Sequence, residues 1–176
     1  MIVENRVGGG VYLSPSNEDK LARVYDLYHT PMLRLALRVL GEAHDAEDAV
    51  HDAFESVTRN LDRLAEPEDP KTRGYIMVVT ERKAIDLLRV RKKHESAELD
   101  EDAGCVEFPD TGEHGLAWCM TRLPPRYREI LLLRFVYGYS MRETAELMDI
   151  PFTTVGKLSQ RAKERLYEIC RREGIL

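Results

Sequence analysis

The strongest pattern in this sequence is an apolar stripe that begins just after residue 45. Its members recur every three or four positions and are Ala46, Ala49, Val50, Ala53, Phe54, Val57, Leu61 and Leu64. This spacing places all of them on one face of an α-helix, and such a face is stable only when other elements cover it. Helical spacing returns on both sides of this segment, and no alternating strand pattern competes with it. We therefore expect an all-α fold.

Turn-forming residues divide the first half of the chain into helices. Apolar residues keep helical spacing over residues 32–40 and stop at Gly41, which is suited to a C-terminal cap. Residues 65–73 contain two prolines, so we expect a loop there, followed by a long helix over residues 74–92. The first seventeen residues show no period and are expected to form a flexible tail.

The acidic residues are concentrated in one short segment. The chain carries a net charge of −5, yet residues 95–113 alone carry −8 and contain no Lys or Arg. This segment also contains glycine and proline and few apolar residues, which is typical of an extended linker. We therefore expect two small helical domains, residues 18–94 and 114–176, joined by a flexible acidic linker. The rest of the chain has a net charge of +3, with basic stripes in residues 81–94 and 156–172.

The second half has the spacing of a helix-turn-helix. A helix over residues 116–123 and another that starts at Pro124 and has Phe135 among its inward positions precede the motif. Ser140 and Glu143 predict a capping box for the next helix, and a turn follows at residues 149–151. The final helix then presents an inward stripe of Val155, Leu158, Ala162, Leu166 and Ile169.

The outward positions of this final helix suit DNA. A helix that enters the major groove contacts bases and phosphates with its N-terminal part, where this chain has hydroxyl, amide and cationic side chains. The predicted DNA-binding residues here are Thr153, Thr154, Lys157, Gln160, Arg161 and Lys163. The alternative is an ordinary helical hairpin whose charged face is only solvated.

Two faces of opposite charge mark the first domain. The acidic face comprises Asp45, Glu47, Asp48, Asp52 and Glu55. The basic face, which we predict to bind DNA, comprises Arg82, Lys83, Arg89, Arg91, Lys92 and Lys93. An acidic surface repels DNA and a basic one attracts it, so the pair suggests a protein partner on one side and nucleic acid on the other. The alternative is two helix faces that simply contact water.

Several functional classes find no support in the sequence. Nothing near the N-terminus resembles a signal peptide, and no apolar run is long enough to cross a bilayer, so we expect a cytoplasmic protein. Cys105, Cys119 and Cys170 lack metal-ligand spacing, and the five histidines are scattered. No phosphate-binding loop or nucleophile motif is present, so we expect neither a cofactor nor an enzyme.

Three blocks of the sequence together resemble one known family. They read YDLYHTPMLRLALRVLGEAHDAEDAVHDAF, then GYIMVVTERKAIDLLRVRKK, then LPPRYREILLLRFVYGYSMRETAELMDIPFTTVGKLSQRAKERL. Their order and the linker between them resemble the extracytoplasmic-function (ECF) subgroup of the bacterial sigma-70 family, over residues 20–93 and 114–170. The resemblance implies that the first region binds the clamp of core RNA polymerase and the minus-ten promoter element. It implies that the second region binds the polymerase flap and the minus-35 element.

The resemblance also assigns roles to single positions. Asp45, Glu47, Asp48 and Asp52 match the clamp-binding helix, and the loop from Glu66 to Arg73 matches a pocket for a flipped minus-ten base. Near that pocket, Arg73 supplies a cation. Tyr75 stands where many relatives have tryptophan, and it could serve as a stacking platform for the base or as a packing residue. Arg82 replaces the usual asparagine, and Asp149 replaces the usual glycine of the turn.

Two questions remain open at this level. The linker is implied to thread the polymerase channel, either as a mimic of nucleic acid or as a soluble tether. The alternative to a sigma factor is a stand-alone helix-turn-helix regulator, against which the acidic face of the first domain argues. The resemblance also makes an anti-sigma factor a candidate partner of the chain.

Overall fold

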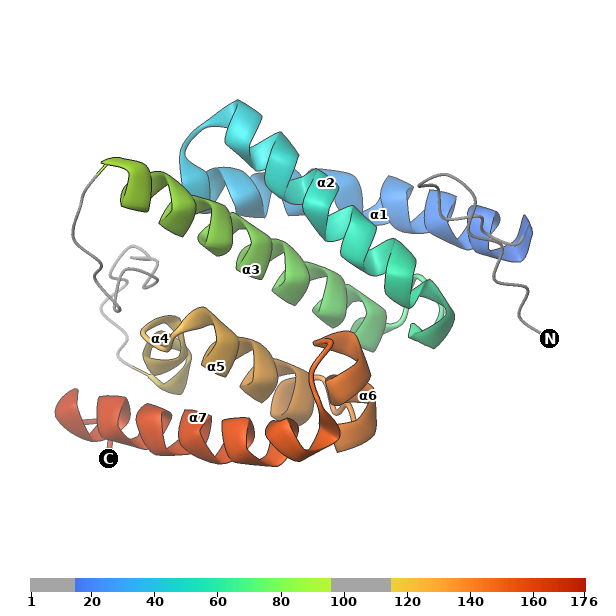
Figure 1. Ribbon diagram of the computed structural model, residues 1–176. Helices are drawn as coiled ribbons and strands as arrows, with labels where there is room; N and C mark the ends of the chain where they lie inside the picture. The colour runs from blue at the N-terminus through green and yellow to red at the C-terminus, as the bar shows by residue number, and fades with distance from the viewer. Residues whose placement is uncertain (1–14, 96–114) are drawn as a thin grey trace.

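The computed structural model describes residues 15–95 and 115–176 of this protein (Figure 1). The first domain contains α1 (Pro15–Leu40), α2 (Ala43–Asn60) and α3 (Pro70–Glu95). The second contains α4 (Leu116–Thr121), α5 (Pro125–Leu131), α6 (Met141–Leu147) and α7 (Phe152–Arg172). The described residues contain no strand, which confirms the expected all-α class. Of the predicted tail, residues 1–14 lie outside the described residues, and residues 15–17 are not a tail but the first turn of α1. Of the predicted linker, residue 95 ends α3 and residues 96–113 lie outside the described residues.

The first domain is a bundle in which α1, α2 and α3 all contact one another. The predicted stripe is buried except for Phe54, which is half-buried, and Ala46, Ala53 and Val57 are fully inaccessible to solvent. Gly41 ends α1 at φ +70°, a conformation that strains any side chain with a Cβ. Glu42 then caps α2, because its Oε2 accepts a hydrogen bond from the Asp45 amide at 2.9 Å.

The expected loop before α3 is shorter than predicted. The helix begins at Pro70 rather than at Gly74, because proline has no amide to satisfy and fits the first turn of a helix. The carboxylate of Asp69 accepts a hydrogen bond from the Lys71 amide at 2.7 Å and so supports this early start. Lys71, Thr72 and Arg73 are therefore helical.

The helix-turn-helix forms as predicted, with one change before it. The Ser140–Glu143 capping box is present, and Asp149 adopts φ +51° in the turn between α6 and α7. Helix α5 runs into a π-helical turn, Leu132–Val136, in which the Tyr137 amide donates to the Leu132 carbonyl at 2.9 Å. This turn shifts the helical register, so Phe135 points outward with 54% exposure, and the prediction that it is buried is wrong.

The two domains pack against each other along α3. Helix α5 and the π-helical turn both contact α3, and α5 lies beneath α3 in Figure 1. Buried apolar residues of both domains consequently join in a single core. Among the described residues, no helix has both the length and the apolar character that a membrane crossing requires.

Candidate functional site

The first part of α7 exposes the side chains that the sequence predicted for DNA. Val155 and Ala162 are fully buried against the second domain, which turns the opposite side of the helix to solvent. Thr153, Lys157, Gln160, Arg161 and Lys163 are exposed, and Thr154 is half-buried. Within the described residues neither Lys157 nor Arg161 forms an ion pair, whereas Gln160 donates to Glu164 at 2.9 Å and Lys163 lies over the Phe135 ring. This surface can therefore offer point charges and paired hydrogen-bond donors to a ligand.

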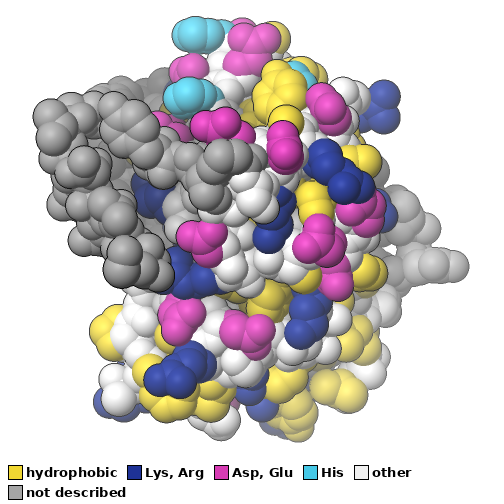
Figure 2. All heavy atoms as spheres, turned by 90° about the vertical axis from the view of Figure 1, so that its right-hand side faces the viewer, with side chains coloured by type: hydrophobic (Ala, Val, Ile, Leu, Met, Phe, Trp, Pro, Cys, Tyr) yellow, Lys and Arg dark blue, Asp and Glu magenta, His cyan; other side chains and the backbone are white. Residues whose placement is uncertain are grey.

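The acidic side of α2 is likewise turned to solvent. Glu47, Asp48, Asp52 and Glu55 are exposed, whereas Asp45 is half-buried and accepts a hydrogen bond from Arg91 at 2.9 Å. Two histidines of α2 lie one turn from these acids, with His44–Asp48 and His51–Glu55 distances of 3.9 and 3.8 Å. Figure 2 shows histidine and acidic side chains gathered at the top of the molecule, over α1 and α2. The face is acidic overall and suits a basic partner.

An aromatic cluster that the sequence reasoning missed adjoins this face. The rings of Tyr25 and His29, one turn apart on α1, stack at a centroid distance of 4.6 Å. The Phe54 ring of α2 lies 5.2 Å from Tyr25, and Tyr25 is still 49% exposed. The four-residue spacing of Tyr25 and His29 could have indicated their contact, but only the fold brings Phe54 beside them. An exposed aromatic stack of this kind can anchor a protein partner.

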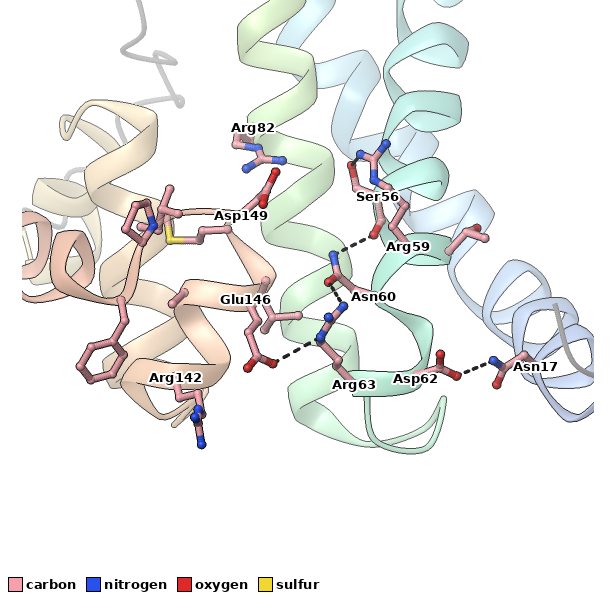
Figure 3. A pocket seen from close by; sticks show the side chains of 17 residues that line it. Asn17, Ser56, Arg59, Asn60, Asp62, Arg63, Arg82, Arg142, Glu146 and Asp149 are labelled. Carbon is pink, nitrogen blue, oxygen red and sulfur yellow. Dashed lines mark hydrogen bonds and ion pairs between the residues drawn. The ribbon is translucent and has the colours of Figure 1, made fainter. Parts of the chain in front are cut away.

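A polar groove of about 1640 Å³ separates the end of α2 from α6 and the turn into α7 (Figure 3). Arg59, Arg63, Arg82 and Arg142 line it together with Asp62, Glu146 and Asp149. Arg63 and Glu146 join across the two domains at 3.3 Å. The sequence did not predict this groove, because its walls come from segments that are distant in the chain.

The basic stripe of α3 is largely engaged with carboxylates. Arg82 donates to Glu129 of α5 at 3.1 Å, and Lys83 lies 3.9 Å from Asp52. Arg91 is bound to Asp45 as described above. Of the other predicted cations, Arg73 is exposed and Arg89 half-buried, and the side chains of Lys92 and Lys93 lie outside the described residues.

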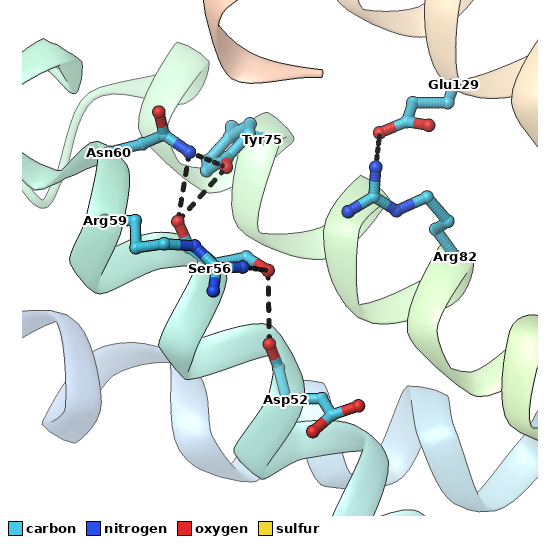
Figure 4. Close-up of polar contacts among 7 residues, drawn as sticks. All are labelled: Asp52, Ser56, Arg59, Asn60, Tyr75, Arg82 and Glu129. Carbon is cyan, nitrogen blue, oxygen red and sulfur yellow. Dashed lines mark hydrogen bonds and ion pairs between the residues drawn. The ribbon is translucent and has the colours of Figure 1, made fainter. Parts of the chain in front are cut away.

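Tyr75 lies in the core of the first domain rather than on a surface (Figure 4). It is 1% exposed, and its hydroxyl accepts a hydrogen bond from the Asn60 amide at 2.9 Å. Burial raises the pKa of Tyr75 to about 12. The sequence left base stacking and packing open for this residue, and its buried position allows packing. The three-residue spacing between Tyr75 and the buried Val78 is consistent with a shared inward face of the helix.

Comparisons with known proteins match both domains. The family model described as Sigma-70 region 2 matches residues 24–94, and the one described as Sigma-70, region 4 matches residues 116–166. The ECF RNA polymerase sigma factor SigW of Bacillus subtilis is 25% identical over 185 residues, which cover 94% of this chain and 95% of SigW. The RNA polymerase sigma factor SigV of the same organism is 30% identical over 139 residues, 76% of each chain.

Among solved structures, the sigma factor RpoE of Bartonella quintana, in complex with the anti-sigma factor NepR, covers 90% of this chain with a TM-score of 0.46 and 16% identity. The sequence relatives and the two family models agree on one family and on the order of its two regions. This chain therefore belongs to the sigma-70 family of RNA polymerase sigma factors, in its ECF subgroup.

Proposed function

We propose that this chain binds core RNA polymerase and directs promoter-specific initiation of transcription in the cytoplasm, without catalysis of its own. The proposal rests on two exposed surfaces in one chain. One is the acidic face of α2, and the other is the surface of α7 that carries the predicted DNA-binding residues. The acidic face would dock on the polymerase clamp, and α7 would enter the major groove of the minus-35 element. A stand-alone regulator would need only the second of these surfaces.

The minus-ten element would bind where the loop after α2 meets α3. Arg73 is exposed in the first turn of α3 and can contact phosphate there. Tyr75 would support this site from within, because its hydroxyl ties α3 to Asn60 at the end of α2. Arg82 and Lys83 would first have to leave their carboxylate partners.

Reconstituted transcription tests the proposal. Core polymerase from a related bacterium would be mixed with the full chain and genomic DNA fragments, and the start sites sequenced. We expect discrete start sites that share two upstream motifs, one for each DNA-binding domain. Tight, specific binding of the chain alone to an operator, with no new start sites, would favour the stand-alone regulator instead.

Lys157 and Arg161 are expected to contribute to binding of the minus-35 element in different ways. Lys157 offers a point charge, so Lys157→Ala should weaken binding to all sequences. It should also lower the salt slope, the steepness with which log K falls against log salt concentration, by about 0.9. Arg161 can form paired hydrogen bonds to a base edge, so Arg161→Ala should cost about 1–3 kcal/mol of discrimination at one or two positions. A randomised-promoter transcription assay measures both effects.

Arg171→Ala is the matched control for that assay. Arg171 is an exposed cation on the same helix, about 15 Å beyond Arg161 along its axis. It should leave both base preference and salt slope unchanged. If Lys157→Ala changed base preference while Arg161→Ala lowered output uniformly, α7 would lie in the groove in a different orientation.

The aromatic cluster should contribute to polymerase binding. Tyr25→Ala removes the exposed ring of the stack, and truncation of such an anchor at an interface commonly weakens binding about 10- to 30-fold. Leu37→Ala is the control, because Leu37 is an exposed apolar residue on another side of α1. Titration of labelled chain with core polymerase measures both affinities, and equal small losses would remove the cluster from the interface.

A further inference from the structure

The first half of α1 holds the segment that joins α2 to α3. This α2–α3 loop, residues 61–69, begins with one turn of 3-10 helix, Leu61–Arg63. Four side chains of α1 reach it, and they are Asn17, Lys20, Arg23 and Tyr28. Asn17, Lys20 and Tyr28 are separated by three and eight residues, which places them on one side of the helix. The shape of the loop therefore depends on a helix that begins 46 residues before it.

Lys20 makes the central contact. Its Nζ donates to the carbonyl oxygen of Leu61 at 3.0 Å and to that of Leu64 at 2.7 Å. The side chain is half-buried, so its ammonium group loses part of its hydration, and these hydrogen bonds replace it. Hydrogen bonds from a charged donor are stronger than those between neutral groups. One amino group thus fixes two carbonyls of the loop that lie three residues apart.

Tyr28 fixes a third carbonyl farther along the loop. Its hydroxyl donates to the carbonyl oxygen of Pro67 at 2.6 Å, and the residue is 7% exposed. Burial raises the pKa of Tyr28, so the hydroxyl keeps its proton and remains a donor at neutral pH. Pro67 has no amide, so its carbonyl is the one backbone group through which it can be held. Lys20 and Tyr28 together anchor the loop at three-residue intervals.

The outer side of this seam is polar and loosely packed. Arg23 forms an ion pair with Glu68, and Asn17 donates to Asp62 (Figure 3). Such exposed pairs contribute little stability by themselves. A cavity of about 290 Å³ also lies between α1 and the loop. The half-buried and buried hydrogen bonds of Lys20 and Tyr28 are therefore the contacts that can order the loop most strongly.

An ordered loop matters for the site proposed above. The minus-ten element would bind where this loop meets α3, and an unpaired base needs a pocket that is already formed. A mobile loop would lose conformational entropy for every residue that binding fixes, and that loss would weaken recognition.

We propose that Lys20 and Tyr28 are positioning residues for minus-ten recognition: α1 holds the α2–α3 loop in the shape that receives the unpaired base, and neither side chain contacts DNA. The inference rests on the proposed function, because that function places the minus-ten element at this loop. In the sequence Lys20 looks like one more cation available for phosphate. In the folded chain its amino group is already bound to two carbonyls.

Two variants remove the contacts independently, with little change of shape. Lys20→Met keeps the stem of the side chain and removes its donors, and Tyr28→Phe keeps the buried ring and removes the hydroxyl. Arg34→Met is the control for charge, since Arg34 is exposed on the same helix, about 21 Å farther along its axis. Tyr167→Phe removes an exposed hydroxyl from α7 and is the control for the tyrosine change. Lys20→Arg supplies donors for both carbonyls and should restore much of the function.

Transcription with core polymerase measures recognition. The template is a promoter found by the start-site sequencing above, with its minus-ten element randomised. We expect Lys20→Met to reduce base discrimination there about 10-fold or more and Tyr28→Phe about 2- to 10-fold, because a charged donor contributes more than a neutral one. Preference at the minus-35 element and affinity for core polymerase should stay unchanged.

The salt slope separates positioning from direct contact. If Lys20 neutralised a phosphate, Lys20→Met would lower the slope by about 0.9 and weaken binding to all sequences alike. A positioning residue should leave the slope unchanged and alter base preference.

Hydrogen exchange on the free, full chain tests the loop without polymerase. The amides of Leu64 and Asp69 donate within the loop, at 3.3 and 3.0 Å, and report its order. In Lys20→Met they should exchange about 10-fold faster or more, whereas the amides in the middle of α2 and α3 should exchange as in the wild type. Lys20→Arg should return the exchange toward the wild-type rate.

The possible results separate this inference from the proposed function. Unchanged exchange of the loop in both variants would show that α1 does not hold it. A uniform loss of output, with base preference intact, would reduce Lys20 and Tyr28 to a purely structural role and overturn the proposal. Failure of the sigma function would appear instead as an absence of promoter-directed transcription by the wild-type chain.

Discussion

Changing Asp48 and Asp52 together to lysine is expected to weaken binding to core RNA polymerase at least about 100-fold, because four units of charge reverse on the face that would meet a basic clamp. Both side chains are largely exposed, 62% and 59%, opposite the buried Ala49 and Ala53. Asp52 has only a distant ion pair with Lys83, at 3.9 Å. The fold should therefore be almost unaffected.

A titration of fluorescently labelled chain with core polymerase measures this effect. Glu164→Lys with Glu168→Lys reverses the same amount of charge on α7 and serves as the control. Circular dichroism melting would establish that all variants fold alike. Should the α2 and α7 variants bind equally well, the acidic face would have no special part in assembly.

Tyr75→Ala is expected to lower the free energy of unfolding by about 3–5 kcal/mol, as truncation of a large buried ring usually does. Tyr75 is 1% exposed and closes the core between α2 and α3. Tyr75→Phe keeps the ring and removes only the hydroxyl, which would leave the Asn60 amide with one partner fewer at a cost of about 1–3 kcal/mol. Urea unfolding measures both differences.

The same two variants distinguish packing from base stacking. A stacking platform would tolerate alanine with little loss of stability but would lose affinity for single-stranded minus-ten DNA, and phenylalanine would restore that affinity. A stable Tyr75→Ala chain that binds single-stranded DNA poorly would thus return Tyr75 to the DNA surface.

Local patterns were sufficient to predict most of the helices and their faces. The helical period identified the buried stripe of α2, Gly41 marked the end of α1, and Ser140 with Glu143 marked the start of α6. These features depend on neighbours within about four residues, which is the range over which helical hydrogen bonds and caps act. For the same reason, the helical period also identifies the outward residues of α7.

The ion pairs formed by the predicted DNA-binding cations could not be predicted from the sequence. Arg82 meets Glu129, 47 residues away in the chain, and Arg91 meets Asp45, 46 residues away. No local rule relates such positions, because the partners meet only after α3 has packed on α2 and α5. Three of the four stripe cations whose side chains the structure describes are thus paired with carboxylates.

From the sequence alone it was possible to determine the all-α class, the two regions, the helix-turn-helix and the family, since each of these follows from short-range spacing or from ordered motifs. The tertiary structure alone decided that Tyr75 is buried, that Phe135 is exposed after a π-helical turn, and that α5 covers α3. The physical reason is that burial and ion pairing depend on surfaces from distant segments, whose contact no local spacing encodes.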